Sequence, residues 1–97
     1  MKILVEQTIE GLLEAKQWPA IAHYFSLHEP SSAMEFKARA LQRIHLGKDA
    51  SALHLAAADF EEACRRAPAD PVNWINLAQC QLDIGLTDAA FASAMAA

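Results

Sequence analysis

Residues 56–85 read AAADFEEACRRAPADPVNWINLAQCQLDIG and hold the pattern that decides the fold. Apolar side chains recur at three- and four-residue spacing on both sides of a short segment between Pro68 and Pro71. Such spacing places the apolar residues on one face of a helix, whereas proline suits only the first turn of a helix. The stretch therefore predicts a helix, a tight turn and a second helix that ends at Gly85.

The composition of the whole chain favours the same kind of structure. The 97 residues include 21 alanines and 11 leucines, but only two valines and two threonines. Alanine and leucine lose little conformational freedom in a helix, while β-branched side chains lose more. We expect a single all-α domain over residues 1–97, without a sheet.

Periodicity and capping residues predict six helices in all. The expected ranges are 3–17, 20–28, 33–46, about 50–66, 71–84, and 87 to the end of the sequence. Ser32 with Glu35 three residues later has the spacing of a capping box. Asp49 or Ser51 stands at the start of the fourth range and Asp70 at the start of the fifth, as N-cap residues would.

The charges and the two cysteines exclude several classes of function. Residues 1–48 carry six Lys or Arg and five Asp or Glu, while residues 49–97 carry two and seven. Neither half is basic, so nucleic acid is not expected as a partner. Neither a signal peptide nor a membrane-spanning apolar run is predicted. With Cys64 and Cys80 alone, we expect a cytoplasmic protein with buried, reduced thiols.

The helices follow an internal repeat. Three positions of the central stretch recur 34 residues later as alanines: Ala56, Phe60 and Ala63 correspond to Ala90, Ala94 and Ala97. Two others recur 38 residues earlier: Trp74 and Gly85 correspond to Phe36 and Gly47. The pattern divides the chain into three units of two helices each, at about 3–30, 32–68 and 70–97.

These residues resemble the tetratricopeptide repeat (TPR) family. One half of the repeat motif is similar to Trp74, Leu77, Ala78, Gly85 and Ala90, and the other half to Ala56, Phe60, Ala63 and Pro68. The resemblance implies a short right-handed α-solenoid of stacked helix pairs. It also implies a protein-binding role without catalysis, with a peptide or helix held in the concave groove. Phe60, Trp74, Leu77 and Leu82 would fill the space between pairs.

The groove of such a solenoid is lined by the first helix of each pair. Spacing along these helices points to seven groove residues: Glu6, Glu10, Lys37, Leu41, Ile75, Asn76 and Gln79. Only Lys37 and Asn76 suit the recognition of an acidic C-terminal tail, so we do not expect such tails as ligands. The stripe of Glu6, Glu10 and Glu14 is either a solubilising outer face or a docking strip for a basic peptide.

No set of residues predicts a cofactor, a metal site or an enzyme active site. The four histidines, His23, His28, His45 and His54, do not form a His-x-x-x-His pair, and there is no Cys-x-x-Cys. Asp59, Glu61 and Glu62 are interpreted as a charged, solvated helix face. The two tryptophans, Trp18 and Trp74, are interpreted as core residues.

The C-terminal segment FASAMAA leaves Phe91, Ala94 and Met95 without a helix to cover them. Three explanations stay open: self-association through Phe91 and Met95, cover by a partner, or membership of a longer protein. We predict an adaptor or chaperone-like scaffold of bacterial type. The alternatives are an N-terminal module of, or accessory subunit to, an enzyme such as a glycosyltransferase or sulfotransferase, and a stand-alone enzyme or metal protein.

Overall fold

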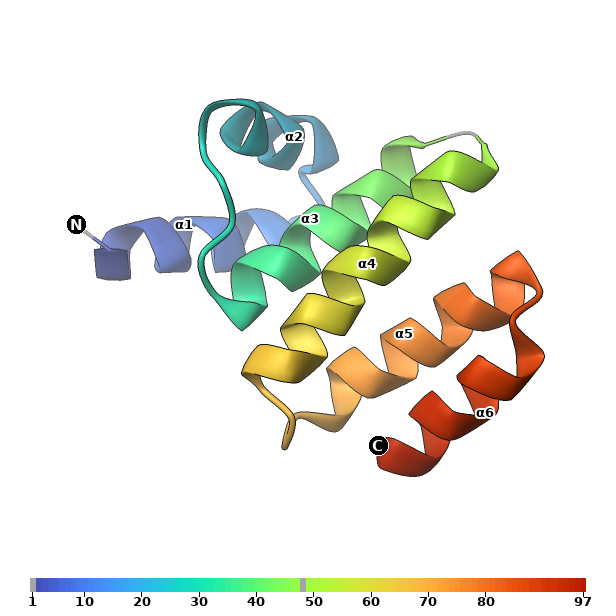
Figure 1. Cartoon of the computed structure of the whole chain (residues 1–97). Coiled ribbons are helices and arrows are strands. Elements are labelled where there is room, and N and C mark those ends of the chain that lie inside the picture. Colours follow the sequence, from blue (N-terminus) through green and yellow to red (C-terminus); the bar gives the residue numbers. More distant parts are fainter. Residues whose placement is uncertain (1, 48) are drawn as a thin grey trace.

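The computed structural model describes the backbone of residues 2–47 and 49–97, and the side chains of residues 8–47 and 49–97. These residues form six α-helices and no strand, which confirms the all-α prediction (Figure 1). The helices are α1 (Lys2–Glu14), α2 (Trp18–Leu27), α3 (Ala33–Leu46), α4 (Ala50–Arg66), α5 (Pro71–Ile84) and α6 (Thr87–Ala96).

Local chemistry determines where the last four helices begin and end. The side chains of Ser32, Asp49 and Asp70 accept hydrogen bonds from backbone N–H groups in the first turns of α3, α4 and α5. Gly85 has a φ of +92°, in the left-handed region that favours glycine, and ends α5. The N–H of Leu86 bonds to the carbonyl of Gln81 at 2.8 Å, which completes the C-cap.

The first two helices differ from their predicted ranges. The first ends at Glu14, three residues early, because Lys16 adopts a φ of 54° and its N–H bonds to the carbonyl of Leu13. The second begins at Trp18, so that Pro19 lies in its first turn, where a missing N–H has no cost.

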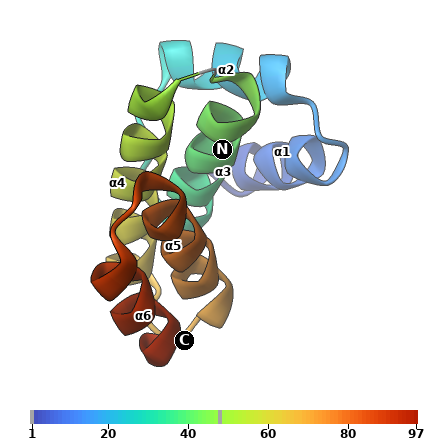
Figure 2. The same ribbon diagram turned by 90° about the vertical axis from the view of Figure 1, so that its right-hand side faces the viewer.

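The helices are arranged as a chain of packed neighbours around α3 and α4 (Figures 1 and 2). α3 and α4 are antiparallel and pack closely along their length. α1 and α2 pack against α3, α5 packs against α4, and α6 packs against α5. The α3–α4 pair is therefore the platform on which both ends of the chain are assembled.

The core consists of two clusters, and α3 contributes to both. The first lies among α1, α2 and α3 and is centred on Ile9, Ile21 and Ala38. The second lies among α3, α4 and α5 and has the fully buried Phe60 at its centre. Trp74 and Leu77 pack into this second cluster, as predicted, but Leu82 is 54% exposed and does not. The prediction for Leu82 is wrong because Leu82 lies along a hollow between α5 and α6 instead of in the core.

A buried carboxylate joins α4 to α3. Asp59 is 3% exposed and accepts hydrogen bonds from Arg39 Nε and Nη2 at 3.1 and 2.8 Å. Arg43 Nη1 donates to the same carboxylate at 2.8 Å. The interpretation of Asp59 as a solvated residue beside Glu61 is therefore wrong. The helix period alone could not show that two arginines, 16 and 20 residues earlier, lie against it.

A second buried carboxylate holds the loop before α3. Glu35 Oε1 accepts hydrogen bonds from the hydroxyls of Ser31 and Ser32 at 2.8 and 3.2 Å. Its Oε2 accepts one from the Tyr24 hydroxyl at 3.0 Å. Burial opposes ionisation of Glu35, but these hydrogen bonds outweigh it and hold the pKa of the carboxyl below its usual value. The network ties α2 to the start of α3.

Replacing Asp59 tests the link between α3 and α4. Asp59→Ala leaves two partly buried guanidinium groups without their carboxylate and should lower the free energy of unfolding by about 2–4 kcal/mol. Urea denaturation followed by circular dichroism measures this loss. The control is the triple variant Arg39→Met, Arg43→Leu and Asp59→Leu, which should recover part of it because no charge stays buried. An unchanged midpoint for Asp59→Ala would show that the network contributes little.

Phe60→Ala tests the second core cluster. Removing a fully buried aromatic ring between α3, α4 and α5 should lower the free energy of unfolding by roughly 3–5 kcal/mol. Thermal denaturation measures the change, and Phe91→Ala is the matched control because Phe91 is 70% exposed. Equal effects of the two variants would contradict the assignment of Phe60 as the centre of the core.

Candidate functional site

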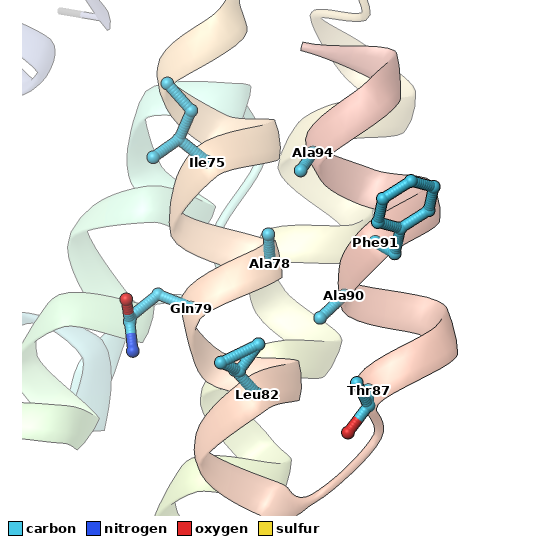
Figure 3. Close-up of a pocket in the computed structure, with 8 residues that line it drawn as sticks. All are labelled: Ile75, Ala78, Gln79, Leu82, Thr87, Ala90, Phe91 and Ala94. Carbon is cyan, nitrogen blue, oxygen red and sulfur yellow. The ribbon is translucent and has the colours of Figure 1, made fainter.

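The most apolar hollow described in the structure lies between α5 and α6 and has a volume of about 380 Å³ (Figure 3). It is lined by Ile75, Ala78, Gln79, Leu82, Thr87, Ala90, Phe91 and Ala94. Ile75, Leu82 and Phe91 are 57%, 54% and 70% exposed, although each is large and apolar. We call this hollow and its lining residues the α5–α6 pocket.

The pocket arises because α5 has apolar side chains on two faces. Leu77 and Cys80 point into the core, whereas Ile75 and Leu82, seven residues apart, lie on one other face of the helix. On α6, Phe91 lines the same hollow (Figure 3). The two helices thus present an apolar trough that no described element fills.

The packing between α5 and α6 forms a rigid base for the α5–α6 pocket. Ser93 donates a 2.6 Å hydrogen bond to Gln81 Oε1, and both side chains are buried. Ala78 and Ala90 are small, which allows the two helices to approach closely. The trough is consequently set by packing that does not depend on its exposed side chains.

The charge near the pocket is negative. Residues 67–97 contain Asp70, Asp83 and Asp88 but no Lys, Arg or His. Gln79, which lines the pocket, donates a 3.0 Å hydrogen bond to Asp83 Oδ1. Asp88 follows Thr87 in the first turn of α6 and lines a separate hollow at the α5–α6 turn. Asp83 and Asp88 thus each adjoin a residue that lines the pocket, Gln79 and Thr87 respectively.

The structure divides the predicted groove residues between two places. Ile75 and Gln79 line the α5–α6 pocket. Glu10 and Lys37 line a smaller hollow of about 230 Å³ between α1 and α3, together with Leu13, Glu14 and Met34. Because no described pocket contains residues from both places, the structure does not bring the predicted set together at one hollow.

The other three predicted groove residues lie elsewhere. Leu41 is half-buried and packs against the second core cluster, so it belongs to the interior rather than to an open groove. Asn76 is half-buried and lines none of the described pockets. The side chain of Glu6 lies outside the described residues, so the acidic stripe can be followed only through Glu10 and Glu14, which are exposed.

The residues with catalytic or metal-binding chemistry are dispersed over the part of the chain that the structure describes. That part contains no group of three or more His, Cys, Asp or Glu side chains arranged to hold a metal ion. His45 stacks on Trp18 with ring centroids 4.2 Å apart, and His28 stacks on Tyr24 at 4.6 Å. No helix over the described residues is long and apolar enough to cross a membrane.

The two cysteines are buried free thiols, which confirms their predicted burial. Burial raises the pKa of each thiol to about 11, with smaller contributions from nearby carboxylates: Asp70 and Glu61 for Cys64, and Asp83 for Cys80. Since the thiolate is the reactive form, neither thiol is activated at neutral pH.

Thiol reactivity tests this assignment. Because a thiol of pKa about 11 is almost wholly protonated at pH 8, both cysteines should react at least about 100-fold more slowly in the native chain than in denaturant. The measurement is the rate of absorbance change with an aromatic disulfide reagent, with and without urea. A fast native phase from either residue would contradict the buried, unactivated state.

Comparison with known proteins adds no relative to this picture. No family model, no curated protein and no solved structure matches the chain.

The sequence identified Phe91 and Ala94, two of the four α6 residues that line the pocket, as uncovered, but it did not assign Thr87 and Ala90 to this surface. Ala90 was named only as a position of the repeat, and residue 87 only as the start of a helix. The signal that could have found the pocket is the second apolar stripe of α5, Ile75, Ala78 and Leu82, at three- and four-residue spacing. A helix with apolar residues on more than one face needs a neighbour on each. The two expected neighbours of α5, the helices over about 50–66 and from 87 onward, leave Ile75 and Leu82 of this stripe exposed.

Proposed function

We propose that the chain is a protein-interaction module, an adaptor or scaffold without catalytic activity, which binds a helix or peptide of another protein. The observation that carries this proposal is the exposure of Ile75, Leu82 and Phe91 around one pocket. Contiguous apolar surface is costly in water, and a partner that covers it gains free energy in proportion to the area buried.

We also propose that the helix pairs stack as a short TPR-like solenoid. Three observations support this arrangement: the 34-residue relation between α4 and α6, the antiparallel pairing of α3 with α4 and of α5 with α6, and the packing of α5 on α4. In such a stack each pair covers the previous one and leaves the last apolar face open. The α5–α6 pocket lies on a face of α5 and α6 that no other described helix covers.

Peptide selection on the full 97-residue chain tests the proposed function. A random peptide library displayed on phage should yield sequences that bind the chain with a Kd of about 1–100 µM, measured by fluorescence anisotropy. The variant Ile75→Ser with Phe91→Ser should weaken their binding at least about tenfold, because it removes the two most exposed apolar walls.

The control is Leu27→Ser with Leu55→Ser, which removes two equally exposed apolar side chains outside the pocket. It should change the Kd less than about twofold. Failure to enrich any peptide above an unrelated helical protein would contradict the proposed function.

A further inference from the structure

Within this chain, one helix already packs on a pair of helices, and this packing shows what an occupant of the α5–α6 pocket would look like. α5 lies on the face of the α3–α4 pair, where Leu77 and Cys80 contact the cluster that contains Phe60. It runs parallel to α3 and antiparallel to α4 (Figure 1). We call the surface of α3 and α4 that α5 contacts the first seat. It combines the small α4 residues Ala56 and Ala57 with the large ring of Phe60.

The α5–α6 pocket corresponds to the first seat in the next pair of helices, and we call it the second seat. The positions of Ala56 and Phe60 recur as Ala90 and Ala94, and those of Leu41 and Ile44 recur as Gln79 and Leu82. Ala90, Ala94, Gln79 and Leu82 all line the pocket (Figure 3). The same kind of surface that holds α5 is thus repeated on α5 and α6 and left open.

One substitution explains why the second seat is hollow. At the position of the buried Phe60 ring, the second seat has Ala94, which is exposed. The missing ring leaves space next to Ala90, Phe91 and Leu82. An occupant must therefore supply a bulky side chain of its own at this point, because a helix with small residues alone would leave a void.

The negative charge near the α5–α6 pocket favours some binding partners over others. A second copy of the chain that docked through the same face would bring Asp83 and Asp88 again, with no cation over residues 67–97 to oppose them. Like charges brought together at an interface oppose association. A partner with Lys or Arg at the corresponding end is complementary, and exposed carboxylates near an apolar pocket would also steer its approach.

We propose that the α5–α6 pocket binds an amphipathic helix of a partner protein, parallel to α5, which inserts a bulky apolar side chain opposite Ala94 and carries Lys or Arg in its last turn. The orientation follows from α5, which runs parallel to α3 and antiparallel to α4 (Figure 1). In the same orientation, the last turn of the partner helix meets Asp83 and Asp88. Cations there also suit the dipole of that helix. This inference rests on the proposed protein-binding function and adds the site and the chemistry of the partner.

The probe is a stapled helical peptide of about four turns. Trp, Leu, Leu and Ile follow the spacing of Trp74, Leu77, Cys80 and Ile84, alanine and glutamine fill the other positions, and two lysines occupy the last turn. One matched peptide has two glutamates in place of the lysines, and another carries the lysines in its first turn. We expect the first peptide to bind at least about tenfold more tightly than either of the others.

Variants of the chain locate the binding. Ala94→Phe fills the hollow from within and should weaken binding of the first peptide at least about tenfold. The matched control Ala92→Phe places the same ring on an exposed α6 position that does not line the pocket and should change binding less than about twofold. Asp83→Asn with Asp88→Asn should remove most of the preference for lysine and most of its dependence on salt. Circular dichroism verifies that each variant is folded.

The results separate this inference from the proposed function. If selected library peptides bind but respond to Glu10→Lys with Lys37→Glu and not to Ala94→Phe, the module binds proteins elsewhere and the inference is overturned. Equal affinity for the lysine and glutamate peptides would also overturn it. Sedimentation showing a dimer that Ala94→Phe dissociates would assign the pocket to a second copy instead.

Discussion

The ion pairs between Asp59 and the two arginines Arg39 and Arg43 hold the central pair of helices in register. A carboxylate that is 3% exposed is stable only where donors surround it, so α4 can pack on α3 only in the position that brings it to both guanidinium groups. Directly beside this network, Phe60 fills the space between α3, α4 and α5. Directional hydrogen bonds thus set the alignment of the platform, and apolar packing supplies most of its stability.

The same platform explains where the functional surface lies. α5 uses Leu77 and Cys80 to pack on the platform, and its other apolar stripe is then turned away from the core. α6 joins α5 through small residues and the buried bond between Ser93 and Gln81. It leaves Phe91 exposed. Each helix pair presents a surface on which the next helix can pack. The pocket therefore remains open because no described helix packs on the surface of α5 and α6.

Much of the fold could be predicted because it depends on neighbours in the sequence. The bounds of α3, α4 and α5 follow from Ser32, Asp49, Asp70 and Gly85, each of which acts on a backbone within a few residues of itself. The site was harder to predict. Ile75 and Gln79, which helical spacing placed on one predicted surface, line the same pocket, but Lys37 and Glu10 lie in another hollow, since their relation to α5 depends on how the helices cross.

By itself the sequence determined six helices, the ends of α3, α4 and α5, a repeat of about 34 residues and the burial of both thiols. These features depend on local helix propensity and on the number of apolar faces along each helix, and both can be read directly from the sequence. Only the tertiary structure decided that Asp59 is buried and Leu82 exposed, although both are helical positions with unremarkable neighbours. The reason is that a helix period defines faces but not what lies against them, and the cost of burying a charge or exposing a leucine depends on that contact.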